Sequence, residues 1–338
     1  MFDKYWVKVI FLGTIQVVNF CNAYLCYLEL WELEVHHCVL LFGTRQKQCS
    51  RRQERPALPK EGTVKNMVAR ATRQDDIHTI NVKGQPLRVA IRPGNGSGTP
   101  LLLMNGIGVS FEVFQQFIDE LDPNMEIIRF DAPGTGGSPA PTKPYRFWNL
   151  CLLIARMLDQ LGYERVDVIG VSWGGALAQQ FALQYPRRCR RLVLVCTGPG
   201  VGAIPGDPTA MMKMIMPQRF KDPVHMMDIA ADLYGGDLRS NPEFVRELAH
   251  AMRADEPQGY LFQMMAAIGW SSLPWLMFLR QPTLILMGDD DRLAPAVNGN
   301  IMHMLIPRSK LHIYHGGHLG LLTHAKELAP IVKRFLPT

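Results

Sequence analysis

The sequence lacks the charge pattern of a nucleic-acid-binding protein and the cysteine spacing of a metal site. Its formal net charge is +6, and residues 45–65 supply most of the excess, with seven basic side chains against two acidic ones. The rest of the chain is close to balanced, which argues against a surface for nucleic acid. The 7 cysteines form no metal-type or disulfide pattern, and this odd count indicates a reducing compartment with buried thiols.

The N-terminal extension, residues 1–66, differs in composition from the rest. Residues 9–28 carry no charge, and residues 45–65 form a polar, basic linker. Three interpretations are open: a signal peptide with a poor cleavage site near Cys21, a single membrane anchor, or upstream sequence that the mature protein lacks, with Met67 as the working start. Apolar sequence resumes at residues 38–42, which argues against a signal peptide. We favour the third interpretation, so a membrane partner is not expected unless this segment is retained.

The chain is organised around a strand–turn–helix pattern at residues 166–185. An apolar run rich in β-branched residues predicts a buried strand, and helix formers follow the turn. Between them, Gly170, Ser172 and Gly174 form the Gly-x-Ser-x-Gly pattern of a nucleophile elbow, in which a strained turn exposes the serine hydroxyl. A Cβ at either glycine would clash, because strand and helix pack closely there. The alternative is a glycine-rich turn whose serine has no catalytic role. However, the predicted strand before the turn and the predicted helix after it are the flanks that the elbow requires. Ser172 is the predicted nucleophile.

A serine nucleophile needs an acid that orients its base, and on the α/β-hydrolase scaffold the chain order is serine, acid, histidine. The acid is therefore expected after a late strand, where Gly288 is followed by Asp289, Asp290 and Asp291. The turn at Gly288 lets the third of these residues point back toward the strand ends. Asp291 is the predicted acid, and Asp289 and Asp290 are expected to be solvated.

Two histidines follow the last predicted strand. His318 lies in a loop behind two glycines, which let the backbone approach the serine closely, so it is the predicted base. His315 lies at the strand end and is predicted to be structural or solvent-facing. The predicted oxyanion donors are two backbone N–H groups, that of Trp173 directly after the nucleophile and that of Ile107 in the loop after the strand at residues 101–104. This chemistry requires no metal and no cofactor.

Strands and helices alternate along residues 67–204 and 283–338. Residues 77–91 predict a hairpin with its turn at Lys83 and Gly84. Further strands are predicted over residues 101–104, 126–130, 166–171, 192–196, 283–287 and 311–314, and helices over residues 111–121, 147–161, 176–185 and 324–335. This alternation predicts an α/β fold with a mostly parallel sheet covered by helices on both faces. Residues 205–282 contain helical patterns and no strand, which predicts an inserted helical cap.

From about Arg88 to Leu336 the chain resembles the intracellular medium-chain-length poly(3-hydroxyalkanoate) depolymerases of the α/β-hydrolase superfamily. The elbow, acid and histidine blocks are typical of the whole superfamily. The extended elbow block and the cap fragments are what narrow the resemblance to this one family. In that family the catalytic triad falls on Ser172, Asp291 and His318, and a serine at the elbow speaks for hydrolysis because the related polymer synthases use cysteine there. The matching blocks are Asn105-Gly106-Ile107-Gly108, Pro144-Tyr145-Arg146-Phe147, residues 170–182, Tyr234-Gly235-Gly236, Gly269-Trp270, Gln281-Pro282-Thr283-Leu284, Gly288-Asp289-Asp290-Asp291 and Gly317-His318-Leu319.

The resemblance implies a serine hydrolase that cleaves poly(3-hydroxyalkanoate), preferably of medium chain length, on the surface of polyester granules in the cytoplasm. Two alternatives are open: a small-molecule carboxylesterase or lipase with the same triad, and a non-catalytic granule-associated protein with a relic elbow. A complete triad in chain order argues against the second. Ten methionines between residues 211 and 277 predict a cap with an adaptable apolar face that covers Ser172, forms an acyl pocket and attaches to the polymer.

Overall fold

The computed structural model describes residues 75–215, 223–239, 245–246 and 257–336. The N-terminal extension, with its three interpretations, lies outside the described residues. Within the described ranges, no helix combines the length and the apolar character needed to cross a bilayer.

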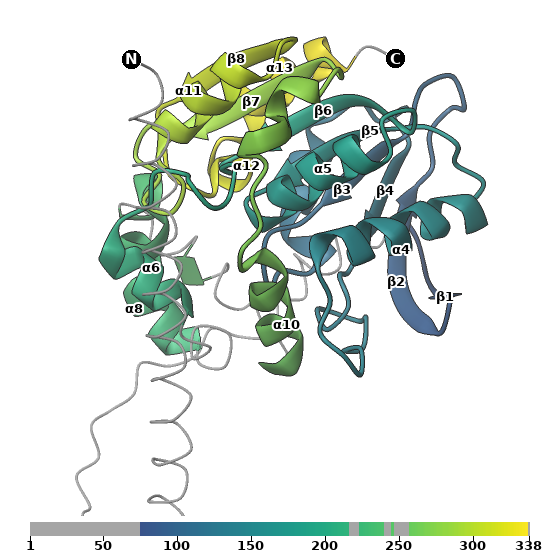
Figure 1. Ribbon diagram of the computed structural model, residues 1–338, viewed down its shortest axis with the longest axis horizontal. Helices are drawn as coiled ribbons and strands as arrows, with labels where there is room; N and C mark the ends of the chain where they lie inside the picture. Colours follow the sequence, from purple (N-terminus) through teal and green to yellow (C-terminus); the bar gives the residue numbers. More distant parts are fainter. Residues whose placement is uncertain (1–74, 216–222, 240–244, 247–256, 337–338) are drawn as a thin grey trace, which may run out of the picture. The chain divides into compact units, whose positions relative to one another are not determined.

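An eight-stranded sheet in the order β1-β2-β4-β3-β5-β6-β7-β8 forms the centre of this part of the chain (Figure 1). Its first two strands form the predicted hairpin, whose turn holds Lys83 and Gly84 at φ 55° and 89°. β2 pairs antiparallel with β4, and every later pairing is parallel, so the predicted mostly parallel sheet is confirmed. The strands are β1 (Asp76–Val82), β2 (Gln85–Arg92), β3 (Leu101–Met104), β4 (Ile127–Phe130), β5 (Val166–Val171), β6 (Cys189–Val195), β7 (Thr283–Gly288) and β8 (Ser309–Tyr314).

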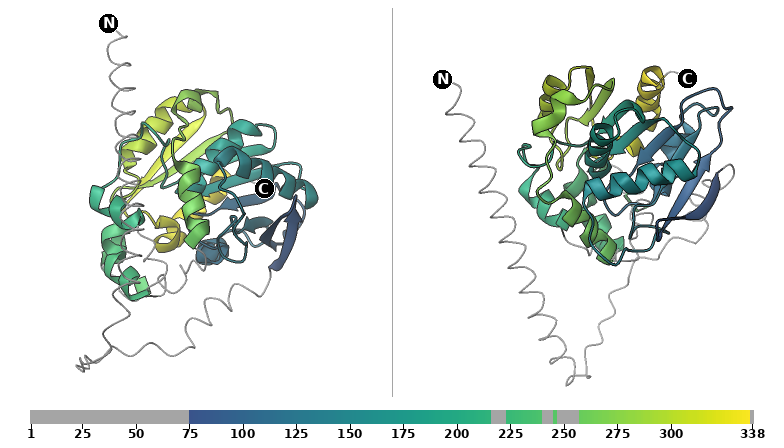
Figure 2. Two further views of the ribbon diagram at one scale, coloured as in Figure 1. Left: turned by 60° about the horizontal axis from the view of Figure 1, so that its bottom comes forward. Right: turned by 45° about the vertical axis from the view of Figure 1, so that its right-hand side comes forward.

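Helices cover both faces of the sheet, which is why the central strands are mostly apolar. Every residue of β3, β4, β5 and β7 is buried. α4 (Phe147–Gln160) and α5 (Trp173–Gln184) lie side by side on one face, where α11 (Ala296–Leu305) also packs on β7 and β8. On the opposite face, α3 (Gln115–Asp119) packs against α13 (Ala325–Phe335) and the short α12 (Gly320–Thr323) (Figure 2).

Two predicted helices differ in detail from the structure, and one helix was not predicted. The helix expected over residues 111–121 begins as a 3-10 turn, η1 (Phe111–Phe114), before α3. The closing helix begins at Ala325, after α12. The sequence patterns do not predict α11, because Asn298, Gly299 and Asn300 give its first half a low helix propensity. Packing on β7 and β8 stabilises α11 in spite of that propensity.

The loop at residues 131–138 is held in shape by the buried carboxylate of Asp131. This carboxylate accepts the N–H groups of Phe111 and Gly137, each at 2.9 Å, and pairs with Arg88 at 3.1 Å. Burial nevertheless raises the pKa of Asp131 to about 6 and outweighs the opposing effect of the two N–H donors. A Cβ on Gly136 would lie 2.3 Å from this carboxylate, so the loop can wrap the acid closely because the residue is glycine.

The described residues between β6 and β7 form helices and no strand. They are α6 (Pro208–Ile215), α8 (Pro223–Tyr234), η2 (Gly236–Arg239), α10 (Pro257–Ala267) and η3 (Leu273–Phe278). Of the methionines here, Met226 is buried, while Met212 and Met277 are exposed. Met216 and Met252 lie outside the described residues. α10 is seated on the loop at residues 131–138 through direct contact between Gly259 and Gly134.

We predict that Gly259→Ala destabilises the protein. Helix propensity alone would make this change stabilising by about 1 kcal/mol. The added Cβ, however, would lie 1.8 Å from the carbonyl oxygen of Gly134, and no rotamer change can move a backbone atom aside. We expect a net loss of roughly 1–3 kcal/mol in the free energy of unfolding, measured with urea. Gln258→Ala, an exposed position in the same helix, is the control. A more stable Gly259→Ala protein would show that α10 does not rest on this loop.

Candidate active site

The turn between β5 and α5 holds Ser172 in a backbone conformation that L-residues rarely adopt, with φ 54° and ψ −117°. Close packing enforces this turn. A Cβ on Gly170 would lie 2.3 Å from the carbonyl oxygen of Gly174, and a Cβ on Gly174 would lie 2.2 Å from that of Met104. The two elbow glycines are therefore required by sterics, and the turn places the hydroxyl of Ser172 beyond the end of β5.

The three residues predicted to share the chemistry meet in one hydrogen-bonded line. His318 Nε2 lies 2.8 Å from Ser172 Oγ, and His318 Nδ1 lies 2.8 and 3.0 Å from the two carboxylate oxygens of Asp291. A carboxylate can only accept, so Nδ1 carries the proton and Nε2 accepts the hydroxyl of Ser172. Asp291 is buried, and the N–H groups of Leu293 and Ala294 also donate to it, at 2.9 and 2.8 Å. This is the geometry of a nucleophile, a base and an orienting acid.

The histidine loop is fixed by Tyr234, at the end of α8. The N–H of His318 donates to the carbonyl oxygen of Tyr234 at 2.8 Å, and the two rings stack with centroids 6.1 Å apart. A Cβ on Gly317 would lie 2.4 Å from that carbonyl oxygen, and a Cβ on Gly236 would lie 2.3 Å from the nitrogen of Gly317. Sequence reasoning used Tyr234-Gly235-Gly236 as a family fragment and gave it no role. Its position beside the histidine loop is the role that was missed.

The other two aspartates of the acid block have partners of their own. Asp290 was expected to be solvated, but it is half-buried and its carboxylate accepts the N–H of Gly236 at 2.7 Å. Asp289 is exposed, and its carboxylate lies 2.9 Å from Nδ1 of His315. The hydrogen bond from His315 lowers the pKa of Asp289. His315, itself exposed, thus contacts Asp289 and not the acid that faces His318.

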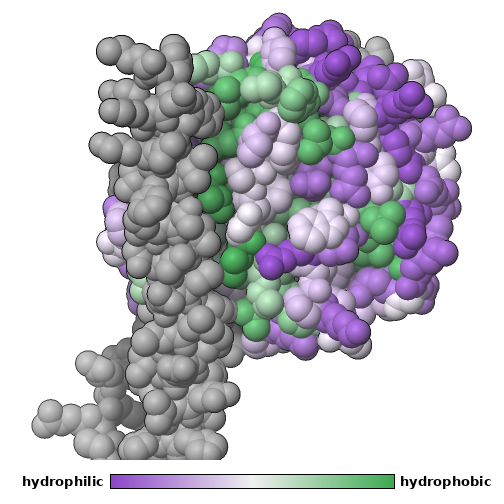
Figure 3. All heavy atoms as spheres, viewed as in Figure 1, coloured by the Kyte–Doolittle hydropathy of each residue, from purple (hydrophilic) through white to green (hydrophobic). Residues whose placement is uncertain are grey.

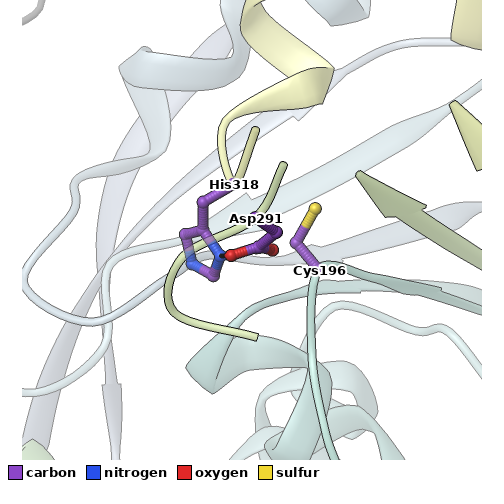
Figure 4. A group of neighbouring side chains, drawn as sticks. All are labelled: Cys196, Asp291 and His318. Carbon is purple, nitrogen blue, oxygen red and sulfur yellow. Dashed lines mark hydrogen bonds and ion pairs between the residues drawn. The ribbon is translucent and has the colours of Figure 1, made fainter. Parts of the chain in front are cut away.

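A cysteine lies behind the acid, where sequence reasoning assigned nothing. Cys196 follows β6 at φ 47°, and its Sγ lies 2.9 Å from the hydroxyl of Tyr314. The ligand atoms of Cys196, Asp291 and His318 all lie within 4.8 Å of one another, which a metal ion would require (Figure 4). Burial, however, raises the pKa of the Cys196 thiol and opposes the thiolate that a metal binds. Asp291 and His318 are already bonded to each other, so the group fits a proton-transfer line better than a metal site.

The loop expected to supply one oxyanion donor runs beside the nucleophile. A Cβ on Gly106 would lie 3.8 Å from the Cβ of Ser172, and Ile107 shares a pocket with Ser172. Trp173 is the first residue of α5, so its N–H belongs to the helix turn that lacks intrahelical acceptors. Both backbone groups named from the sequence thus lie next to Ser172.

An apolar pocket opens at Ser172 and His318. Its walls come from the oxyanion loop, from η1, from the end of β5, from the histidine loop and from the helices between β6 and β7. The remaining residues that line it are Gly106, Ile107, Val109, Val113, Phe114, Val171, Met214, Tyr234 and Leu319. An acyl chain is the kind of group that such walls can hold.

Comparison with known proteins assigns this arrangement to a family. The family model described as the alpha/beta hydrolase fold matches residues 99–325. A poly(3-hydroxyalkanoate) depolymerase of Ectopseudomonas oleovorans is 48% identical over 258 residues, which cover 76% of this chain and 91% of that protein. A 2-hydroxy-6-oxo-2,4-heptadienoate hydrolase of Pseudomonas putida is 30% identical and covers 71% of this chain and 90% of its own length.

Solved structures agree on the fold. A hydrolase from Pseudomonas aeruginosa superposes with a TM-score of 0.68 at 23% identity, covering 78% of this chain and 99% of that one. An enol-lactonase from Burkholderia xenovorans gives the same TM-score at 20% identity, with 77% and 99% covered. The chain belongs to the α/β-hydrolase family and, within it, to the group of the poly(3-hydroxyalkanoate) depolymerases.

Proposed function

We propose that the protein hydrolyses the ester bonds of poly(3-hydroxyalkanoate) through an acyl-enzyme on Ser172. The observation that carries the proposal is the line from Ser172 through His318 to the buried Asp291, with contacts of 2.8 Å on both sides of the imidazole. The 48% identity to a protein named for this activity supports the choice of polymer.

Each residue takes the role that is usual for a hydrogen-bonded serine, histidine and aspartate. Nε2 of His318 removes the proton of Ser172, whose Oγ attacks the ester carbonyl of a 3-hydroxyacyl unit, while Asp291 stabilises the imidazolium. The N–H groups of Ile107 and Trp173 stabilise the oxyanion. The bond between the acyl carbon and the ester oxygen then breaks, and His318 gives its proton to that oxygen, so that the neighbouring unit leaves with a free hydroxyl and the acyl group stays on Ser172. A water activated by the same histidine frees the 3-hydroxy acid, and no step needs a metal or cofactor.

We assign the apolar pocket to the alkyl side chain of the polymer unit. Val113 and Phe114, which line it, come from the hydrolase core, and Met214, which also lines it, comes from α6. Methionine adapts to irregular apolar partners because its side chain is unbranched and flexible. Such walls favour medium-chain units over short ones, since each buried methylene adds to binding.

We assign attachment to the polymer to an exposed apolar patch, here called the η3 patch, made of Met277, Phe278 and Val297. These side chains are 55%, 62% and 42% exposed, and η3 packs against α11, which carries Val297. Apolar residues gather on this part of the surface, over η3 and α11 (Figure 3). An exposed apolar surface suits an insoluble polyester, so the working place is the surface of cytoplasmic polyhydroxyalkanoate granules.

The first prediction concerns the catalytic roles. Ser172→Ala removes the nucleophile and should lower kcat on a chromogenic ester by about 10⁴-fold or more in a protein that still folds. Asp291→Asn should cost about 10⁴-fold, because the imidazole would take the wrong tautomer. Asp289→Asn is the matched control and should cost little, as should Asp290→Asn. If Asp290→Asn were the crippling change, the acid assignment would be wrong.

The second prediction concerns chain length. Emulsified medium-chain polymer should release soluble 3-hydroxy acid faster than short-chain polymer. Val113→Phe fills the pocket and should lower kcat/KM for p-nitrophenyl octanoate by about tenfold or more, with the acetate ester changed far less. Val224→Phe makes the same change at a valine that is 55% exposed and serves as the control. Equal losses on the two esters would place the acyl chain elsewhere.

The third prediction concerns attachment. Phe278→Glu should reduce the fraction of protein that sediments with polymer particles, while turnover of a soluble ester stays unchanged. Thr79→Glu adds the same charge at an exposed site on β1, at the opposite edge of the sheet, and should alter neither quantity. A Phe278→Glu protein that still sediments fully would exclude the η3 patch as the attachment surface.

A further inference from the structure

One residue of α10, Gln263, is bonded to both elements that carry the proposed oxyanion donors. Its side-chain oxygen accepts the N–H of Gly108 at 2.6 Å. Gly108 belongs to the loop after β3 and lies two residues after Gly106, the glycine beside Ser172. The backbone carbonyl oxygen of Gln263 accepts the indole N–H of Trp173 at 2.8 Å. Gln263 is 1% exposed, so neither bond competes with solvent.

The orientation of this amide follows from its partners. The N–H of Gly108 can only donate, so the oxygen of the Gln263 amide must face it. The nitrogen then faces Thr135, to whose hydroxyl oxygen it donates at 2.6 Å. The side chain therefore bridges the oxyanion loop and the loop at residues 131–138, and both ends of the amide are satisfied.

The oxyanion loop needs such an anchor because its own backbone resists rotation poorly. Glycines flank Ile107 on both sides, and Gly108 has a φ of 66°. Peptide units next to glycine rotate at little steric cost. The side chain of Asn105 offers the loop a contact of 3.5 Å to Val109, at the limit of a hydrogen bond. The 2.6 Å bond from Gly108 to Gln263 therefore holds the peptide unit between Ile107 and Gly108, which adjoins the unit that carries the Ile107 N–H.

α10 is itself held firmly enough to serve as a support. Arg146 donates to the carbonyl oxygens of Met265 and Ile268 at its C-terminal end, at 2.7 Å each. Gly259 at its N-terminal end rests against the backbone of Gly134. The helix is thus fixed at both ends, with Gln263 between them.

We propose that Gln263 is a positioning residue that sets the two oxyanion N–H groups and so couples docking of the cap helix α10 to catalysis. The inference rests on the proposed function, because it assumes that Ile107 and Trp173 bind an oxyanion. It assigns the cap a part in stabilising the transition state, in addition to its part in holding the acyl chain.

Gln263→Met tests this proposal, because methionine has a similar shape and removes both side-chain hydrogen bonds. We expect kcat on p-nitrophenyl octanoate, per active site titrated with a fluorophosphonate, to fall by about 10- to 100-fold, since removing an oxyanion donor outright costs about 10²- to 10³-fold. KM should stay within about twofold, because the bond acts on the transition state and not on substrate binding.

Thr135→Val is the matched control. It removes the partner on the other side of the same amide and leaves the bond to Gly108. It should lower the thermal stability about as much as Gln263→Met does, while kcat stays within about threefold. Equal loss of kcat in the two variants, or a loss expressed in KM alone, would overturn the proposal and leave Gln263 a structural residue.

Inhibition gives a second readout. An alkylboronic acid forms a tetrahedral adduct on Ser172, and octanoic acid does not. Gln263→Met should weaken inhibition by the boronic acid by about the same factor as kcat and leave inhibition by octanoic acid unchanged. Equal weakening of both inhibitors would contradict the proposal. If Gln263→Met fails to fold, Trp173→Phe removes the other bond to this residue, and unchanged kcat there would also contradict it.

Failure of the proposed function looks different. If Ser172→Ala retained ester hydrolysis, the nucleophile and the oxyanion hole built around it would both be wrong. If Ser172→Ala is inactive and Gln263→Met is fully active, the mechanism stands and only the role of Gln263 fails.

Discussion

The close packing of β5 against α5 is the constraint on which the site depends. Gly170 and Gly174 let strand and helix approach until no Cβ fits between them, and the chain must then turn through Ser172 at positive φ. The conformational cost of that turn is of order 1–3 kcal/mol. Burial of β3, β5 and their helices offsets it, because these elements belong to one apolar core. The position of Ser172 beyond the end of β5 is therefore set by the packing of its neighbours.

Glycines also allow close backbone contacts where the segment between β6 and β7 packs on the hydrolase core. Gly236 against Gly317 and Gly259 against Gly134 are contacts between backbones. Backbone atoms cannot move aside by a change of side-chain rotamer, so these contacts leave the two segments little freedom to shift against each other. One of them places Tyr234 against His318, and the other places α10 against the loop at residues 131–138. The helices between β6 and β7 are therefore held against the candidate site with the precision that a catalytic site needs.

Local pattern singled out the three candidate residues that lie on strand-to-loop turns and that the structure brings together. Ser172, Asp291 and His318 each follow a strand of recognisable composition, and parallel strands bring their carboxyl ends together. Gln263 could not be found in this way. It is a polar residue in a helix of little amphipathic character, and its partners are 90 to 155 positions away in the sequence. The hydrogen bond that the Gly236 N–H donates to Asp290 was missed for the same reason, because the sequence does not show which loop the segment between β6 and β7 contacts.

The separation along the chain of the residues that meet at Ser172 has a consequence for folding. Ser172 and His318 are 146 positions apart, and Gly108 and Gln263 are 155 apart. Contacts of this length close large loops and form late, after local helices and hairpins. The sheet from β1 to β6 is complete in sequence before either Gln263 or His318 has been synthesised. A growing chain can therefore bring Ser172, His318 and Gln263 together only after its last strand and its histidine loop have been synthesised, so the proposed catalytic line forms only when folding is complete.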